Sequence, residues 1–435
     1  MRNITCASNV HAMTTTAPAA TTLRRNSEYV RWLIGDVLLA LGASIGVFAF
    51  PLVTYLATGS LAATGLVGLL EGVGGLIGMI PGGLLADRCE RRRLRLIAGG
   101  TGALMQAVLI AVLLMGWASV PTLAVIAFLD RFRGTLLGSA SDAMLKQIVP
   151  PAHLPRAFAV NEGRDAAVDM ISGPVGGVLV GIALFCPPLA QLLGNIGSVV
   201  ATLAMRGRYR PRAEDAVRTR VRDDLREAFA WILSQRIRLQ LLGVAITVNL
   251  GTNGLILTVL LDLAADGIPA GRIGLLNTVL AASILLGAIL APRLVERVPT
   301  GVLTIVPVLV IAVVGVFVPL APGMIAIGAA YAVMGVGLAP LNAASQGFFM
   351  HLTPVAMQGR IGSLMGLVAM GLMPLAPAVA GWGLDLVGPL ITMLAFAGVT
   401  AVGAAVALLG PDLRRVPVAA RWESFARDEG LAAGE

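Results

Sequence analysis

The chain is constrained most strongly by a succession of long apolar runs, each about as long as a lipid bilayer is thick. A helix needs about 20 apolar residues to cross the hydrocarbon core of a membrane, and twelve runs of this kind are present. The predicted spans are residues 32–57, 61–85, 96–117, 120–143, 157–184, 188–205, 239–263, 273–294, 302–320, 324–349, 361–384 and 390–409. The sequence therefore predicts an all-α membrane protein with twelve transmembrane helices.

The composition excludes most classes of soluble protein. Hydrophobic residues make up 57% of the chain and charged residues 13%, so a soluble fold would expose much apolar surface. The net charge of +8 would suggest nucleic-acid binding in a soluble protein, but loop arginines explain it here. The sequence shows no nucleophile–base pair, metal-ligand cluster or phosphate-binding loop. We therefore expect no enzyme activity, no cofactor, no metal and no nucleic-acid partner.

A charged linker divides the spans into two halves of six. The predicted organisation is a disordered cytoplasmic tail (1–28), a first half (29–205), a linker (206–238), a second half (239–410) and a cytoplasmic tail (411–435). Part of the linker, residues 224–233, has the spacing of an amphipathic helix, which we expect on the membrane surface.

An internal repeat supports the division into halves. Residues 150–156 after span four have the same spacing of Pro and Arg as residues 354–360 after span ten, an offset of 354 minus 150, or 204. Duplicated halves with a binding site between them are typical of secondary transporters.

Arginine is distributed unequally between the loops on the two sides. Arg88, Arg156, Arg360 and the arginines of the linker fall on one side, whereas the other side receives only Arg272. The positive-inside rule therefore places both termini of this multi-pass chain in the cytoplasm.

The turn after span two contains a motif. Its sequence, Gly83-x-Leu85-Ala86-Asp87-Arg88-x-x-Arg91-Arg92, resembles the loop 2–3 signature of the major facilitator superfamily. The Asp-Arg-x-x-Arg-Arg-Arg form is most similar to the drug:proton antiporter branch of macrolide-efflux and siderophore-export type. Gly173-Pro174-x-x-Gly177 resembles part of that branch's span-five signature, and Gly359-Arg360 resembles its entry to span eleven.

The resemblance implies the major facilitator fold, with two pseudo-symmetric six-helix halves. It also implies a monomer in a bacterial cytoplasmic membrane. In that fold spans three, six, nine and twelve are outermost and face lipid. The sequence agrees, because three of these spans lack acids in their cores and span six has only Gln191 and Asn195 as polar groups of note.

The motif also predicts a conformational gate. We expect Asp87 to accept hydrogen bonds from the N-terminus of span eleven, and Arg88 and Arg91 to pair with Asp142. Such contacts would exist only while the cytoplasmic side is closed. The predicted gate residues are Gly83, Asp87, Arg88, Arg91, Arg92, Asp142, Asp165, Gly173, Pro174, Gly177 and Arg360.

Ionisable residues inside the spans are the candidates for proton coupling. Asp36 lies early in span one and Glu71 near the centre of span two. Burial favours the neutral form of a carboxyl group, which allows it to bind and release a proton as access alternates. In span four, Asp130 and Arg133 can pair on one helical face, whereas Arg131 needs another acid. The proton-coupling candidates are Asp36, Glu71, Asp130 and Arg133, with helix-packing carboxyls or a structural ion pair as the alternative.

The substrate cavity is expected, by resemblance, between spans one, four, seven and ten. Apolar walls with a few polar groups suit bulky amphiphilic compounds. The candidates are Phe48, Phe50, Phe128, Arg131, Phe132, Asn249, Asn253, Asn277, Met334 and Asn342. For each of them, helix packing is the competing interpretation.

The sequence therefore predicts a secondary transporter that exports amphiphilic drugs or natural products, macrolide-like, in exchange for protons. Its partners would be the substrate, protons and membrane lipid, and its energy source the proton gradient. The alternatives are a dedicated siderophore or metabolite exporter, a lysophospholipid flippase, or a membrane sensor or scaffold without transport.

Overall fold

The computed structural model describes residues 23, 26–150, 153–207, 209, 221–354 and 357–431. In the first half the helices are α1 (Ser27–Thr58), α2 (Leu61–Arg88), α3 (Arg91–Leu114), α4 (Val120–Ile148), α5 (Leu154–Ile182) and α6 (Cys186–Leu203). The second half contains α8 (Arg236–Ala265), α9 (Ala270–Arg297), α10 (Thr300–Phe317) with the short η4 (Val318–Leu320), α11 (Met324–His351), α12 (Gln358–Gly371) and α13 (Leu375–Leu409). No strand occurs in these residues, which confirms the predicted all-α class.

Among the residues that the structure describes, ten helices are long and apolar enough to cross a membrane. This number is consistent with twelve crossings for two reasons. The helix α4 is absent from the ten, since Asp130, Arg131 and Arg133 lie close together in it. Spans eleven and twelve are continuous in α13, which turns at Gly388 with φ 80°. Glycine adopts this left-handed conformation at little cost.

Span eleven, predicted over residues 361–384, is divided between α12 and α13. The chain leaves the helix between α12 and α13, at residues 372–374. Pro374 and Pro377 have no N–H group, so neither can donate the usual hydrogen bond to the preceding turn. Both prolines pack on α2 instead: a Cβ at Gly72 would lie 2.8 Å from Cβ of Pro374, and one at Gly68 2.6 Å from Cβ of Pro377.

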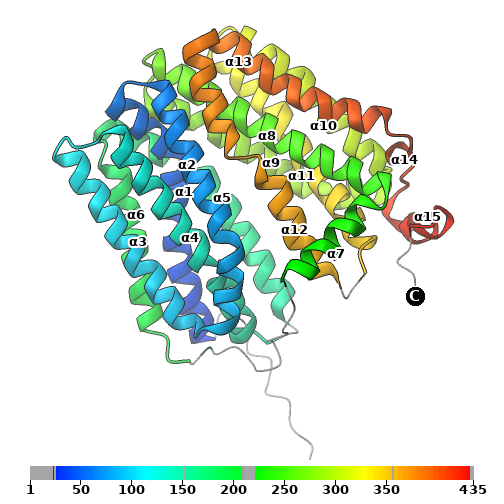
Figure 1. Ribbon diagram of the computed structural model, residues 1–435, viewed down its shortest axis with the longest axis horizontal. Coiled ribbons are helices and arrows are strands. Elements are labelled where there is room, and N and C mark those ends of the chain that lie inside the picture. The colour runs from blue at the N-terminus through cyan, green and yellow to red at the C-terminus, as the bar shows by residue number, and fades with distance from the viewer. Residues whose placement is uncertain are drawn as a thin grey trace, which may run out of the picture.

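The two six-helix halves lie side by side (Figure 1). They approach closely where α5 meets α9 and where α2 meets α13. A Cβ at Gly177 would lie 2.3 Å from the carbonyl oxygen of Ala270, and one at Gly65 2.5 Å from that of Pro377. Small residues of this kind allow helix backbones to approach. Because α5 ends and α2 begins at the face opposite the start of α1, these contacts join the halves at that opposite face.

Two further segments pack on the second half at the face where α1 begins, called the terminal face below. The linker helix α7 (Val221–Leu233) places Trp231 edge-on to Phe349 of α11, with ring centroids 5.7 Å apart. The segment predicted as a C-terminal tail contains α14 (Pro411–Arg414), η6 (Ala419–Arg421) and α15 (Trp422–Asp428). Both α7 and α15 are visible at the same end of the second half (Figure 1).

Candidate substrate and proton site

An inter-half cavity of about 330 Å³ lies between α1, α2 and α4 of the first half and α8, α12 and α13 of the second. Most of its wall is apolar, including Phe50, Leu257 and Met370. The charged side chains that line it are Glu71 and Arg131. Such a cavity suits an amphiphilic molecule, because the wall offers apolar contact and the two charges offer orientation.

A first-half cavity of about 260 Å³ lies among α1, α2, α3, α4 and α6. It shares Glu71 and Arg131 with the inter-half cavity. Its other polar lining residues are Gln106, Asp130, Arg133, Gln191 and Asn195. Glu71 and Arg131 therefore stand where the two cavities meet.

Glu71 comes from the middle of α2 and Arg131 from the middle of α4. Gly75, one turn after Glu71, leaves room for the arginine, since a Cβ there would lie 3.2 Å from Cγ of Arg131. Neither side chain forms a hydrogen bond or an ion pair in the part of the chain that the structure describes. Arg131 attracts a negative charge at Glu71, whereas Asp130 repels it. Glu71 is therefore available to bind a proton, and both side chains are available to bind a ligand.

Asp130 and Arg133 form the ion pair that their spacing predicts. Nη2 of Arg133 lies 2.5 Å from Oδ1 of Asp130, and Nε donates to the same oxygen at 2.9 Å. Gln106 of α3 donates to Oδ2 of Asp130 at 3.2 Å, and Nη1 of Arg133 donates to the carbonyl oxygen of Ala98 at 3.1 Å. These contacts neutralise both charges and tie α4 to α3.

Asp36 lies in a network that joins α1, α3, α4 and α5. It pairs with Arg164 and with Arg95, the latter at 3.3 Å. It also accepts a hydrogen bond from Oγ of Ser141 at 2.7 Å. Nη2 of Arg95 donates to the carbonyl oxygen of Trp32 at 3.1 Å. Since these contacts join four helices, the geometry fits the helix-packing role named above as the alternative for Asp36. Arg95 and Arg164 were not among the residues predicted from the sequence, although an acid in a span signals a basic partner on a neighbouring helix.

The family model described as Major Facilitator Superfamily matches residues 32–257, which is more than half of the chain. The chain belongs to the major facilitator superfamily. Membership in this superfamily supports a transport role rather than an enzymatic one. None of the curated proteins matches the chain.

Several solved facilitator structures share the fold. The nucleoside transporter NupG is 15% identical with a TM-score of 0.71, covering 88% of this chain and 98% of its own. A bacterial homologue of the lysosomal transporter Spinster, inward-facing and unoccupied, is 16% identical with a TM-score of 0.64, covering 95% and 99%. A bacterial homologue of the iron transporter ferroportin, inward-facing, is 16% identical with a TM-score of 0.61, covering 93% and 100%. At these identities the likeness establishes the fold alone.

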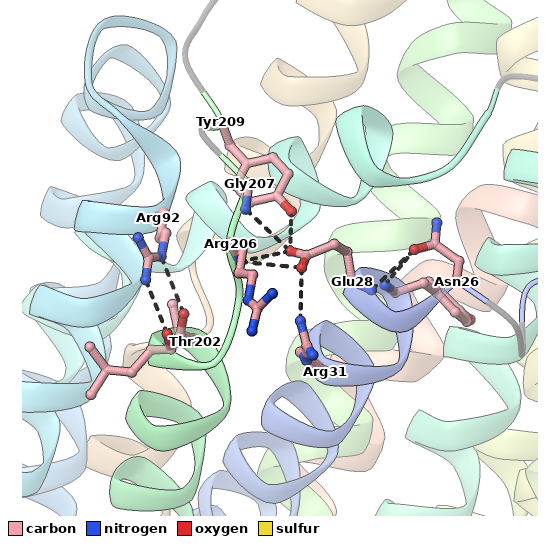
Figure 2. A network of polar contacts seen from close by, with 10 residues as sticks. Asn26, Glu28, Arg31, Arg92, Thr202, Arg206, Gly207 and Tyr209 are labelled. Carbon is pink, nitrogen blue, oxygen red and sulfur yellow. Dashed lines mark hydrogen bonds and ion pairs between the residues drawn. The ribbon is translucent and has the colours of Figure 1, made fainter.

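Two of this facilitator's predicted gate arginines bind the ends of neighbouring helices. Nη1 of Arg91 donates to the carbonyl oxygen of Ala143 at 3.1 Å. Arg92 donates to the last carbonyl oxygens of α6, those of Thr202 at 3.3 Å and Leu203 at 3.1 Å (Figure 2). A cation is favoured at the C-terminus of a helix. These arginines therefore hold the terminal face of the first half together.

The other gate contacts stay predictions. The side chains of three gate residues lie outside the described part of the chain, namely Asp87, Asp142 and Arg360. Arg88 is exposed, and among the described residues no atom would lie within 4 Å of a Cβ at Gly83. Asp165 pairs with Arg164 at 2.8 Å, beside the Asp36 network.

The span-five gate residues lie at the opposite face, in the contact between α5 and α9. A Cβ at Gly173 would lie 2.7 Å from the carbonyl oxygen of Gly274, and one at Gly274 2.9 Å from the nitrogen of Pro174. Gly177 meets Ala270 in the same contact. These residues therefore allow the two halves to approach each other.

The substrate candidates divide into cavity-lining and packing residues. Phe50 and Arg131 line the inter-half cavity, and Asn249 and Asn342 line a second-half cavity of about 260 Å³ among α8, α11 and α12. The other candidates contact neighbouring protein groups. Phe48 and Met334 are only 7% and 1% exposed, and the rings of Phe128 and Phe132 stack with centroids 6.2 Å apart. Asn277 lies against Gly173, and Asn253 donates a hydrogen bond to the carbonyl oxygen of Asn249 at 2.9 Å. Asn253 is exposed and its hydrogen bond lies within α8, whereas for the other members of this second group the geometry favours helix packing.

The exposed leucine, isoleucine and valine side chains of α6 agree with the expectation that span six faces lipid, whereas its polar side chains lie inside the first half. Gln191 and Asn195 line the first-half cavity, and Asn195 is buried. Gln106 of α3 lines the same cavity and was missed from the sequence. The available signal was an amide group in an otherwise apolar span, where lipid would leave it without hydrogen bonds.

The start of the linker is fixed to α1 by Glu28 (Figure 2). The carboxylate accepts hydrogen bonds from Oη of Tyr209 at 2.7 Å and from the backbone N–H groups of Arg206 and Gly207 at 3.2 and 3.4 Å. Burial, together with Glu28, raises the pKa of Tyr209 well above its ordinary value. Tyr209 therefore remains a hydrogen-bond donor at physiological pH, and the linker stays attached to the first half.

Proposed function

We propose that this facilitator is a proton-coupled exporter of amphiphilic drugs or natural products, macrolide-like, in a bacterial cytoplasmic membrane. The observation that carries the proposal is the position of Glu71 and Arg131. Both line the inter-half cavity, and neither has an ion-pair partner in the described residues. We further propose that the chain acts as a monomer with both termini in the cytoplasm.

Exchange would work by competition between substrate and proton at Glu71. Protonation of Glu71 from outside removes its negative charge and weakens substrate binding, so the substrate leaves. Deprotonation on the cytoplasmic side restores binding. The proton gradient then drives export as the halves alternate between two states, because a ligand shifts such an equilibrium by its differential affinity.

The contacts between the halves support alternating access. The close approaches at Gly177 and Gly65 join the halves at the face opposite the termini. With the termini in the cytoplasm, this conformation would be closed to the outside. Opening that face requires these helix contacts to separate, which identifies them as elements of the conformational change.

The proposal is tested by efflux of erythromycin and of ethidium from cells that produce the protein. We expect wild-type efflux to stop when a protonophore collapses the proton gradient, and Glu71→Gln to abolish it. The matched control is Glu296→Gln, because Glu296 is an exposed carboxylate at the end of α9. Efflux of either compound that survives the protonophore would contradict proton coupling. If neither compound moves, the drug-exporter proposal fails, and a siderophore, metabolite or lysophospholipid replaces the drug as the leading substrate.

A further inference from the structure

The first-half cavity contains a buried polar group that protein atoms do not satisfy. Gln106 is 2% exposed, and its Nε2 donates to Asp130 at 3.2 Å. Its Oε1 has no hydrogen-bond partner among the described residues. A buried acceptor without a partner costs about 1–3 kcal/mol. The cavity of about 260 Å³ far exceeds the roughly 10–15 Å³ that one water molecule requires. Water in the cavity would therefore satisfy Gln106.

The polar lining of this cavity extends from Glu71 toward the opposite face. Asn195 and Gln191 are one helical turn apart on α6, and Nδ2 of Asn195 donates to the carbonyl oxygen of Gln191 at 2.8 Å. Pro187 and Pro188, in the first turn of α6, continue the lining. Because α6 begins at the opposite face, the cavity extends from Glu71 toward the side that is external in the proposed orientation.

The surroundings of Glu71 differ between the two cavities. In the inter-half cavity the lining from α1, α8, α12 and α13 is uncharged and largely apolar. In the first-half cavity the lining from α1, α3 and α6 is uncharged but includes three amide side chains. The charged groups that face Glu71 are Arg131 and Asp130 on α4, and Asp130 is neutralised by Arg133. Arg131 thus places a positive charge at the junction, which opposes the passage of a free proton from one cavity to the other.

We propose that the first-half cavity is a hydrated pathway by which Glu71 exchanges its proton, separate from the substrate cavity. Gln106, Gln191 and Asn195 are its positioning residues, since their amides hold water in a chain of hydrogen bonds. A proton enters from external water near the first turn of α6, passes between waters and ends on a carboxylate oxygen of Glu71. This inference rests on the proposed function, because it assigns a proton route to the same carboxyl group.

The pathway is tested by replacing Gln191 with leucine, which has a similar size but no polar group. After a rapid pH change, time-resolved infrared spectroscopy follows the carboxyl band of Glu71, assigned by its loss in Glu71→Gln. We expect Gln191→Leu to slow this titration by roughly ten-fold, which is less than the roughly hundred-fold lost with a proton-transferring group, because Gln191 only positions water. Gln191→Asn retains an amide and should restore most of the rate.

The matched control is Gln240→Leu, because Gln240 packs against Gly410 in the second half, away from both cavities. In Gln240→Leu, the carboxyl group of Glu71 should titrate at the wild-type rate. A wild-type rate in Gln191→Leu, with unfolding temperature unchanged, would overturn the pathway and leave the proposed function standing. Absence of a titrating Glu71 band in the wild type would overturn both.

Discussion

Neighbouring arginines on α4 have different environments, and these set different roles. Arg133 neutralises Asp130 and donates to a backbone carbonyl of α3. Arg131 lines both cavities and has no ion-pair partner in the described chain. A structural role is therefore expected for Arg133, and a role in binding or coupling for Arg131.

Replacing each arginine by methionine separates these roles. Arg133→Met leaves Asp130, which is partly buried, without its counter-ion, so we expect the free energy of unfolding to fall by roughly 2 kcal/mol. Arg131→Met removes no ion pair and should leave stability nearly unchanged while transport is lost. Thermal unfolding in detergent and efflux measure the two effects. Equal destabilisation by both substitutions would contradict the assignment.

At the scale of the helices, the sequence predicted the spans well and their packing less well. Apolar length is a local property, so the segments from α1 to α11 follow from composition. The break in span eleven could have been suspected from Pro374 and Pro377, but Gly68 and Gly72 on α2 receive these prolines, and such a distant contact is not visible in the sequence. The spacing of Asp130 and Arg133 predicted their pairing, since both lie on one helix. Gln106 of α3 was missed, and the amides of α6 were not placed in a cavity, because the face that a residue presents depends on tertiary packing.

The C-terminal segment stabilises the start of α10. The backbone N–H groups of Thr300 and Gly301, which no earlier turn can satisfy, donate to the carbonyl oxygens of Pro417 and Val416 at 3.1 and 3.2 Å. Nε1 of Trp422 donates to Oγ1 of Thr300 at 2.9 Å. The segment therefore caps a helix of the second half.

Trp422→Ala should lower the free energy of unfolding by roughly 2 kcal/mol, because a half-buried indole and its hydrogen bond are lost. The ring also packs against Phe348, with centroids 5.6 Å apart. Trp117→Ala is the matched control, since Trp117 is 67% exposed. The two variants are compared by their unfolding temperatures in detergent. An equally small decrease in both would show that α15 does not stabilise α10.

At the scale of the whole molecule, closure at the opposite face depends on glycine. Gly177→Val places a branched side chain where Ala270 lies 2.3 Å from a Cβ. Overpacking of this kind costs about 1–3 kcal/mol, so we expect the equilibrium to shift toward the state open at that face and transport to fall. Gly181→Val, one turn later on α5, is the control, because a Cβ at Gly181 meets no atom within 4 Å in the described part of the chain.

The distance between spin labels at Ile182 and Arg272, at the ends of α5 and α9, measures this opening. We expect this distance to increase in Gly177→Val and to stay unchanged in Gly181→Val. An unchanged distance together with normal transport would show that the contact between α5 and α9 does not control closure.

The central claim is that substrate and proton compete for Glu71, and proton counting tests it most directly. Ethidium binding is measured by calorimetry in buffers of different ionisation enthalpy, for the wild type and for Glu71→Gln. The account predicts that wild-type binding releases protons to the buffer and that Glu71→Gln binds ethidium more weakly and without proton release. Wild-type binding without proton release, or equal release from Glu71→Gln, would contradict it.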